Sequence, residues 1–349
     1  MEVFEDYVEY TDYTPDNGTS HKMSSYPSGT FEDNISFWKY SSLTINIIIS
    51  LVGLGGNAVV IWISGWKMKR SVNTTFYLSL AISDCLFCAC LPMEIIYEMT
   101  LNWPFGLALC KLTSFALFFN MFSSVFVLVL ISIDRCVMVM FPVWSQNHRT
   151  IKMASGVLVL TWILSATLTL PSLLHRNTRV RGNTTQCYVD NTSISVHKAV
   201  LLTRFIWGFL IPFVIIVSCS IILCMKLRRL TIKSTKPYKV MVTLILSFFI
   251  CWIPFHIFAF LELNMQKHNL DVVQTGMLVG VTLAAANSLI NPFLYVFIGK
   301  EFKQTLRKSL MLRMEYAMAE DGRTACSTPR SKSMGNDAQN SQVFIHNVL

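Results

Sequence analysis

The sequence has few charged residues. Of its 349 residues, 14% are charged and 53% are hydrophobic. A soluble globular domain has about 25% charged residues, so this composition excludes an ordinary soluble protein and indicates one that spans a membrane. Residues 1–10 are acidic and lack the basic segment and apolar core of a cleavable signal peptide. We therefore expect the first apolar run, from about Leu43, to direct membrane insertion.

The sequence lacks the residues that several classes of protein need. No CxxC pair with histidine partners is present, so we expect no metal centre. A retinal-dependent pump needs a lysine in its seventh helix, and residues 273–298 contain none. A transporter built from duplicated halves would show matching segments broken by glycine and proline, and these are missing. Clusters of histidines or acids near one membrane face are also missing, so we expect no enzymatic activity and no catalytic residues.

Apolar segments fill most of the chain, and each is near or above the ~20 residues that a helix needs to cross a bilayer. The seven segments run approximately over residues 42–65, 74–99, 108–140, 153–174, 199–225, 238–263 and 273–298. Basic residues gather in alternate connections, which places the N-terminus outside and the C-terminus inside. The predicted all-α membrane protein has an extracellular acidic tail (1–40), a seven-transmembrane bundle (41–299), a short amphipathic cytoplasmic helix (300–313) and a disordered cytoplasmic tail (314–349).

The segments predicted to be extracellular carry glycosylation sequons and two cysteines. The sequons are Asn17, Asn34, Asn183 and Asn191. Cys110 lies at the start of the third apolar run, and Cys187 lies in the loop between the fourth and fifth runs, both in an oxidising compartment. A disulfide between them would pin this loop over the mouth of the bundle, and the alternative is two free thiols.

Asp84 lies in the middle of the second apolar segment. A carboxylate there costs roughly 2.5–3.5 kcal/mol on insertion scales, so it needs polar partners. The other apolar segments offer Asn57, Asn120, Ser124, Asn287, Ser288 and Asn291. Hydrogen bonds between helices, with water and without an ion, would also account for this set.

Four motifs resemble those of rhodopsin-family G-protein-coupled receptors. They are Asp134-Arg135-Cys136 at the end of the third helix, Trp252 and Pro254 in the sixth, Asn291, Pro292 and Tyr295 in the seventh, and the loop cysteine pair. Proline kinks a membrane helix and allows two alternative packings. Together with Asn57 and Asp84, the resemblance covers residues 42–312.

Within this family, Cys136 and residues 142–150 resemble the chemoattractant branch of formyl-peptide, anaphylatoxin and chemerin receptors. Residues 67–73, 142–150, 235–243 and 260–263 look closest to the chemerin-binding, chemokine-like receptors. One position departs from the family pattern, because Ser220 stands where many members have a tyrosine that joins Arg135 in the active state.

The resemblance implies a plasma-membrane receptor for an extracellular chemoattractant peptide or small protein, similar to chemerin, that signals through an inhibitory (Gi) protein and arrestin. No nucleic-acid partner is expected. Asp84 and its polar neighbours would form a sodium site, with Na⁺ as an allosteric ion and no other cofactor. In the resting state Asp134 would pair with Arg135, and ligand would act on Trp252 to swing the sixth helix outward. A formyl-peptide or anaphylatoxin receptor and a decoy receptor with weak G-protein coupling stay open as alternatives.

Ligand-binding residues are expected at the outer ends of the helices. Arg204 lies two turns before Pro212, and its planar fork suits a terminal carboxylate, although it could instead extend to the interface. Three acids could bind basic groups of the ligand or balance Arg204, and three apolar residues would form the floor. The acids are Glu94, Glu98 and Glu262, and the apolar residues are Phe118, Met121 and Phe255.

The cytoplasmic parts are expected to bind lipid and arrestin. Residues 300–310 place apolar side chains at helical spacing between basic ones, which predicts a helix on the inner leaflet. Serines and threonines of the tail could be solubilising, and in this family they are candidate phosphorylation sites that recruit arrestin. These sites are Thr324, Ser327, Thr328, Ser331 and Ser333.

Overall fold

The computed structural model describes residues 28–190, 194–230, 236–263, 268–298, 302–309 and 311. Several predicted sites lie outside these residues: the sequons Asn17 and Asn191, and the phosphorylation sites Thr324, Ser327, Thr328, Ser331 and Ser333. The chain divides into two units, Met1–Leu306 and Arg307–Leu349, and the helical bundle belongs to the first.

Helices make up nearly all of the described chain. The first helical segment consists of α2 (Ser28–Ile48), η1 (Ile49–Gly53), α3 (Leu54–Trp62) and η2 (Ile63–Lys67), where η marks a π-helical turn. It is followed by α4 (Val72–Thr100), α5 (Gly106–Met140), the short α6 (Pro142–His148) and α7 (Ile151–Leu174). A hairpin of β1 (Arg176–Arg181) and β2 (Thr184–Val189) leads to α8 (Ile194–Phe205), η3 (Ile206–Leu210), α9 (Ile211–Leu230), α10 (Lys236–Glu262) and α11 (Leu270–Ile298).

Seven helical segments of the described chain are long and apolar enough to cross a membrane. They are Phe37–Lys67, Val72–Thr100, Gly106–Met140, Ile151–Leu174, Ile194–Lys226, Met241–Glu262 and Leu270–Tyr295. Each predicted apolar segment falls on one of them, so the predicted seven-helix bundle is confirmed. Residues 302–309 are also helical, within the predicted short helix at 300–313.

The N-terminal boundary differs from the prediction. Helix α2 begins at Ser28, so its first residues belong to the stretch that the sequence predicts as a tail up to residue 40. Proline in the interior of a helix removes a backbone hydrogen bond and kinks or ends the helix. The sequence has Pro27 immediately before this helix and no proline within Ser28–Ile48, so the backbone can extend the first membrane helix outward.

Hydroxyl side chains fix where the helices begin. The Ser71 hydroxyl accepts a hydrogen bond from the Thr74 backbone N–H at 3.2 Å, and the Thr74 hydroxyl accepts one from the Ser71 N–H at 2.8 Å. This reciprocal pair is a capping box that satisfies donors left open at the start of α4. Thr150 caps α7 in the same way by accepting from the Met153 N–H at 3.2 Å.

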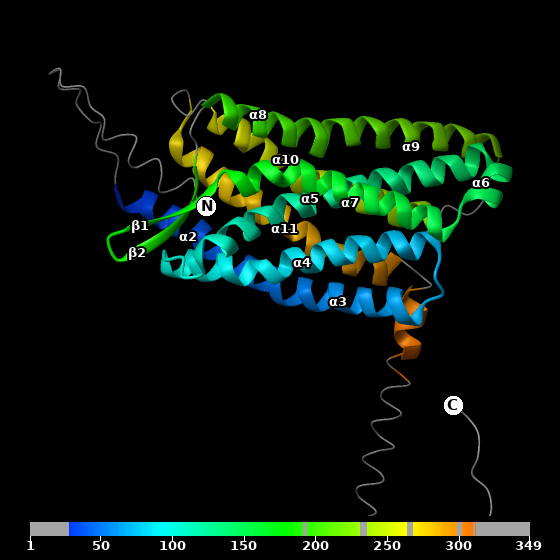
Figure 1. The fold of residues 1–349 in the computed structure, drawn as a ribbon, viewed down its shortest axis with the longest axis horizontal. Helices are drawn as coiled ribbons and strands as arrows, with labels where there is room; N and C mark the ends of the chain where they lie inside the picture. Colours follow the sequence, from blue (N-terminus) through cyan, green and yellow to red (C-terminus); the bar gives the residue numbers. More distant parts are fainter. Residues whose placement is uncertain are drawn as a thin grey trace, which may run out of the picture. The chain divides into compact units, whose positions relative to one another are not determined.

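Helix α5 lies at the centre of the bundle. It packs against α4, α7, α9 and α10. In its most apolar 18-residue stretch 72% is buried, a larger share than in the other six spans. Figure 1 shows the helices running side by side, with the β1–β2 hairpin at one end and α6 at the other. We call these the hairpin end and the α6 end.

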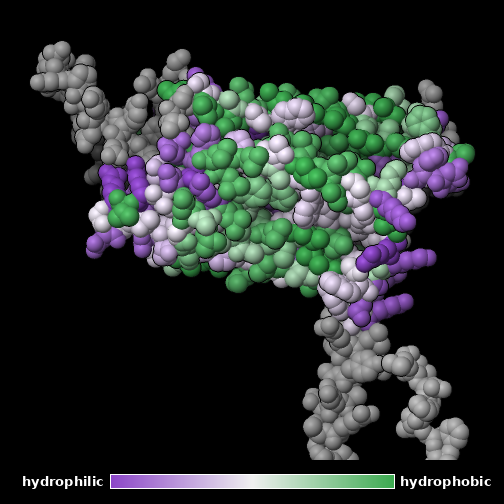
Figure 2. Space-filling view, viewed as in Figure 1, coloured by the Kyte–Doolittle hydropathy of each residue, from purple (hydrophilic) through white to green (hydrophobic). Residues whose placement is uncertain are grey.

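The outside of the bundle is apolar between these ends. Large apolar side chains such as Leu160, Ile163 and Ile250 are more than half exposed. Figure 2 shows hydrophobic residues along the helices and hydrophilic residues gathered at both ends. This distribution suits a bundle surrounded by lipid, because helices satisfy their own backbone hydrogen bonds there.

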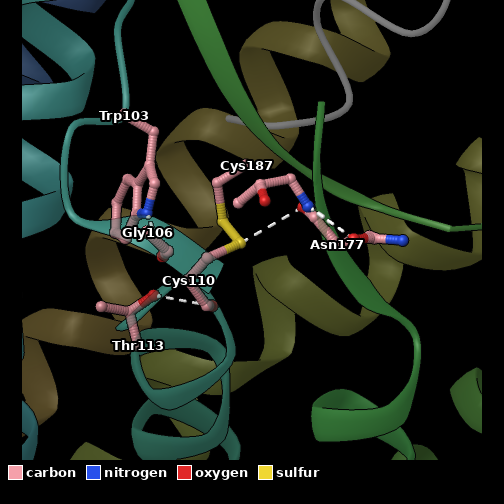
Figure 3. The surroundings of a disulfide bond; sticks show 7 residues. Trp103, Gly106, Cys110, Thr113, Asn177 and Cys187 are labelled. Carbon is pink, nitrogen blue, oxygen red and sulfur yellow. Dashed lines mark hydrogen bonds between the residues drawn. A yellow bond between two sulfur atoms is a disulfide. The ribbon is translucent and has the colours of Figure 1, made fainter. Parts of the chain in front are cut away.

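A disulfide fixes the hairpin to the bundle. Strands β1 and β2 are antiparallel, with Thr178 opposite Cys187, and Cys187 is bonded to Cys110 in the second turn of α5. Beside the disulfide, the Trp103 indole N–H donates to the Gly106 carbonyl at 2.9 Å (Figure 3). The Trp103 backbone N–H donates to the Thr185 carbonyl of β2 at 2.7 Å. The predicted disulfide is therefore present, and it holds β2 against α5.

Helices α10 and α11 approach so closely that Gly280 has no room for a side chain. A Cβ atom there would lie 2.9 Å from the backbone N and Cα of Phe255, whereas a Cβ at Gly156 would meet no atom within 4 Å. We predict that Gly280→Ala lowers the melting temperature of the purified protein, since overpacking costs about 1–3 kcal/mol. Gly156→Ala is the matched control and should leave the melting temperature unchanged or raise it. Equal melting temperatures for the two variants would contradict this packing.

Candidate functional site

A cavity of about 220 Å³ lies at the hairpin end of the bundle. Its walls come from α2, α4, α5, α7, α8, α10 and α11, and from both strands of the hairpin. The structure brings six of the predicted ligand-binding residues together here. They are Glu94, Glu98, Phe118, Arg204, Phe255 and Glu262.

Arg204 points into the bundle rather than toward the membrane interface. Its Nη2 donates a hydrogen bond to the Ser172 hydroxyl at 2.8 Å. The guanidinium carbon lies 3.4 Å from the centroid of the Phe118 ring, which is close enough for a cation–π contact. The alternative that Arg204 extends to the interface is therefore wrong for this conformation, and its positive charge faces the cavity.

Arg176 is a second cation of the cavity, and the sequence did not predict it. It is the first residue of β1, lies opposite Val189, and is 7% exposed. Burial, and then the neighbouring positive charge of Arg204, lower the pKa of Arg176 to about 9, so it stays charged at neutral pH. In the sequence, Arg176 could have been noticed only as a basic residue at the start of the extracellular loop. Which face of the hairpin turns toward the cavity is decided by the disulfide.

Acidic residues lie on two walls of the cavity. Glu94 and Glu98 are one turn apart on α4, and Glu262 lies at the end of α10. Glu98 is 6% exposed and Glu262 is 8% exposed. Among the described side chains, no ion pair joins any of these carboxylates to Arg204.

The floor of the cavity is aromatic and leads to Trp252. The Phe118 and Phe255 rings lie 5.9 Å apart between centroids, and Phe255 lies 5.7 Å from Trp252. Trp252 is 1% exposed and lies beneath this floor, two residues before Pro254 in α10. A ligand that presses on Phe255 would therefore reach Trp252 through one aromatic contact, and one that presses on Phe118 would reach it through two.

Met121 was predicted to belong to the floor, and this prediction is wrong. Its side chain is fully buried in the core and does not line the cavity. It packs where Gly208 of η3 leaves space, since a Cβ at Gly208 would lie 2.7 Å from the Met121 methyl carbon. Met121 is almost one turn further along α5 than Phe118, so it lies deeper in the bundle than the cavity reaches.

Asp84 has found polar partners in the centre of the bundle. Its carboxylate accepts hydrogen bonds at 2.8 Å from the Asn120 amide, the Ser288 hydroxyl and the Asn291 amide. These residues come from α5 and α11, so the network joins three helices. Three donors offset the cost of burying the carboxylate.

The other residues of the predicted polar cluster surround this network without binding Asp84 directly. The Asn57 amide donates to the backbone carbonyls of Gly53 and Ser288, both at 2.9 Å. Ser124 Oγ and Asn287 Oδ1 are buried and have no hydrogen-bond partner within the described part of the chain. These two oxygen atoms are therefore available to a further polar group or ion.

At the α6 end, Asp134 pairs with Arg149 and not with Arg135 as expected. Arg149 Nε donates to one carboxylate oxygen at 2.6 Å, and Nη2 donates to the other at 3.0 Å. Arg135 Nη2 instead donates to the Asn73 side-chain oxygen at 2.7 Å, and Arg149 Nη2 donates to the same oxygen at 2.8 Å. Consecutive residues of a helix do not face each other, so the loop arginine reaches Asp134 more easily than its neighbour does.

The predicted switch residues of α10 and α11 are packed inside the bundle. Pro254 and Pro292 lie within their helices. The Tyr295 ring lies 4.9 Å from Tyr77 and 6.3 Å from Phe302 between centroids. The Ser220 hydroxyl donates to the Ile216 carbonyl of its own helix at 2.8 Å, so it does not reach across to Arg135.

Known proteins with similar sequences agree with this arrangement. The family model of the 7 transmembrane receptor (rhodopsin family) matches residues 56–295. Chemerin-like receptor 1 of Bos taurus is 40% identical over 294 residues, which cover 78% of this chain and 81% of the relative. The C3a anaphylatoxin chemotactic receptor of Danio rerio is 37% identical over 295 residues, covering 84% and 81% of the two chains. Formyl peptide receptor 2 of Mus musculus is 37% identical over 324 residues, covering 86% and 92%.

The chain belongs to the rhodopsin family of seven-transmembrane receptors. This is a family of plasma-membrane, multi-pass G-protein-coupled receptors and not a class of enzymes. The predicted resemblance to the chemoattractant branch is confirmed by the relatives, which are chemerin-like, C3a and formyl peptide receptors.

The Asp134–Arg149 pair generates a stability prediction. The two side chains are 11% and 22% exposed, and each hydrogen bond to a charged group contributes about 1.5–3 kcal/mol. We expect Arg149→Ala to lower the melting temperature of the purified receptor clearly, and Arg149→Lys to lower it less because one bond can re-form. Arg70→Ala, at an exposed residue, is the control and should have no effect. A normal melting temperature for Arg149→Ala would contradict the pairing.

Proposed function

We propose that this chain is a receptor for a chemoattractant peptide or small protein of the chemerin type. The hairpin end faces the outside, the C-terminus faces the cytoplasm, and the receptor signals through a Gi protein and arrestin. The observation that carries the proposal is the inward-facing Arg204 guanidinium, held by Ser172 and Phe118 in a cavity at the hairpin end. The names of the relatives support the choice of ligand class.

The charges of the cavity support recognition of a peptide C-terminus. Arg204 and Arg176 place two guanidinium groups in one cavity. Guanidinium binds carboxylate with two parallel hydrogen bonds, so a free terminal carboxylate is the natural partner. The cavity volume of about 220 Å³ is smaller than the ~300–1,000 Å³ of sites that enclose a drug-sized ligand. The end of a peptide fits this space, while the rest of the ligand would lie outside the cavity.

The aromatic floor supports a route from ligand to helix movement. A ligand bound at Arg204 would contact Phe118 and Phe255, and Phe255 contacts Trp252, which lies close to Pro254 in α10. Movement of α10 at this proline would open the α6 end, where Arg135 and Tyr295 face the G protein. The ligand drives this change only if it binds the open conformation more tightly than the closed one.

The hairpin supports the proposed orientation. Asn183 lies in the exposed turn between β1 and β2, where a glycosylating enzyme can reach it. Asn34 precedes the first membrane span on the same side, although its side chain lies outside the described ones.

Na⁺ fits the polar cluster around Asp84 as an allosteric ion. Ser124 Oγ and Asn287 Oδ1 are buried oxygen atoms without partners in the described chain, near a carboxylate that carries the only formal charge of the cluster. Asp84 with the oxygen atoms of Ser124 and Asn287 would hold the ion, which supplies a positive charge that neutralises the carboxylate.

A decoy receptor for the same ligand is the second candidate function. Ser220 bonds to its own helix, and no hydrogen bond joins a described side chain of α9 to Arg135. This observation favours weak stabilisation of the active state, and ligand binding with arrestin recruitment but without a G-protein signal would select this candidate.

The ligand proposal predicts a response to a C-terminal chemerin peptide. In cells that express the chain, this peptide should activate Gi, whereas a formyl peptide and an anaphylatoxin should not. Arg204→Ala should lower the potency by about 30-fold or more, because removing one partner of a buried charge pair costs about 2–5 kcal/mol. Arg181→Ala, an exposed arginine of the same hairpin, is the control and should keep full potency at equal surface expression. Unchanged potency for Arg204→Ala would exclude the carboxylate contact.

The sodium proposal predicts a change in agonist affinity with the cation of the buffer. Replacing choline chloride by NaCl at constant ionic strength should lower agonist affinity for the wild-type receptor and leave it unchanged for Asp84→Asn. Ser83→Ala removes a buried hydroxyl that bonds only to its own helix, so this control should keep the sodium response. An identical sodium response in Asp84→Asn would rule out the site.

A further inference from the structure

The carboxylates of α4 face the cavity without a cation to balance them. Glu94 and Glu98 both line the cavity. Glu98 is 6% exposed, and its Oε1 has no hydrogen-bond partner among the described residues. Asn46 Oδ1, which also lines the cavity, is buried and has no partner within the described chain. Each carboxylate has one side-chain hydrogen bond, Glu94 to Thr113 and Glu98 to Asn46, so the Glu98 carboxylate is only partly satisfied. A buried oxygen atom without a partner is costly, so Glu98 Oε1 is available to a group that donates hydrogen bonds.

The arginines of the cavity lie on a different wall. Helix α4, which carries both glutamates, packs against α2, α3, α5, α7 and α11. Helix α8, which carries Arg204, packs against α7 and α10. The carboxylate that interacts electrostatically with Arg204 is Glu262 of α10, a neighbour of α8. Glu94 and Glu98 are therefore not needed to balance Arg204.

Lys39 does not form an ion pair with the α4 carboxylates either. It lies on α2 and interacts electrostatically with Glu98, but it does not line the cavity. No ion pair joins Lys39 to Glu98 among the described side chains. The nearby hydroxyls of Ser42 and Thr282 bond to each other at 2.6 Å and leave the carboxylates to the cavity.

The balance of charges in the cavity also favours a positive group on the ligand. Four carboxylates line the cavity, those of Glu94, Glu98, Asp190 and Glu262, against two guanidinium groups, those of Arg176 and Arg204. A ligand that brings only a terminal carboxylate would make this imbalance larger. A ligand that also brings a positive group would reduce this imbalance and would place a cation beside the α4 carboxylates.

We propose that Glu94 and Glu98 form a second subsite that binds the side chain of a lysine or arginine near the C-terminus of the ligand. This inference rests on the proposed function, because the terminal carboxylate is placed at Arg204. The ligand is then a peptide with its free carboxylate on the α8 wall and a positive side chain on the α4 wall. Specificity for such ligands follows from two opposite charges held apart by the width of the cavity.

Matched synthetic peptides test this on the purified full-length receptor. The probes are acetyl-Leu-Phe-Arg acid and acetyl-Leu-Arg-Phe acid, each compared with the same peptide carrying citrulline, a neutral isostere, in place of arginine. Binding is measured by competition and by thermal shift, so no signalling is required. We expect at least one arginine peptide to bind about tenfold more tightly than its citrulline partner, which corresponds to about 1.4 kcal/mol.

Variants assign this preference to α4. Glu94→Gln with Glu98→Gln should remove the preference for arginine and leave the affinity for the citrulline peptides unchanged. Glu98→Gln alone should reduce the preference, which keeps the test valid if the double variant is unstable. Glu262→Gln is the matched control and should retain the preference, because Glu262 lies on the wall of Arg204.

The outcomes separate this inference from the proposed function. Equal binding of arginine and citrulline peptides at both positions, a preference that persists in the double variant, or no binding of any probe at millimolar concentration would overturn the subsite. Arg204→Ala should weaken all four peptides equally. If it leaves their affinities unchanged while the arginine preference persists, the carboxylate contact is wrong and the α4 subsite stands by itself.

Discussion

A negative charge in the middle of a membrane protein is tolerated only when its neighbours satisfy it, and Asp84 organises this bundle around that constraint. Its carboxylate takes hydrogen bonds from α5 and α11, so one buried group ties three helices together at their centres. The cavity lies on one side of this network and the arginines of the α6 end lie on the other. Any movement that connects the two ends must rearrange these hydrogen bonds or pass around them.

The fold followed from segment length and hydropathy, because apolar runs of sufficient length leave a chain few alternatives to membrane helices. The partners of Asp84 were also predictable, since a polar residue in an apolar segment has only other such residues to bond with. How deep a side chain lies in the bundle, and whether it points into the cavity, could not be predicted. Met121 and Phe118 are three positions apart and equally apolar, yet only Phe118 reaches the cavity.

Side chains carried by loops were the least predictable. Arg176 faces the cavity because a disulfide fixes β2 and the hairpin register then turns the first residue of β1 inward. Arg149 took the place that Arg135 was expected to fill, because helix geometry turns Asp134 and Arg135 in different directions. In both cases the decisive information was the path of a loop in space, which residue types alone do not contain.

The shared oxygen of Asn73 has a consequence for how easily this receptor changes state. An amide oxygen has two lone pairs, and here both are used by guanidinium groups, one from Arg135 and one from Arg149. Arg135 is thus held by a neutral acceptor, while the carboxylate that could have held it more strongly is engaged elsewhere. Freeing it costs one hydrogen bond to a neutral amide rather than a separated ion pair. The free-energy difference between the resting and open conformations should therefore be smaller, and the unliganded receptor should adopt the open conformation more often.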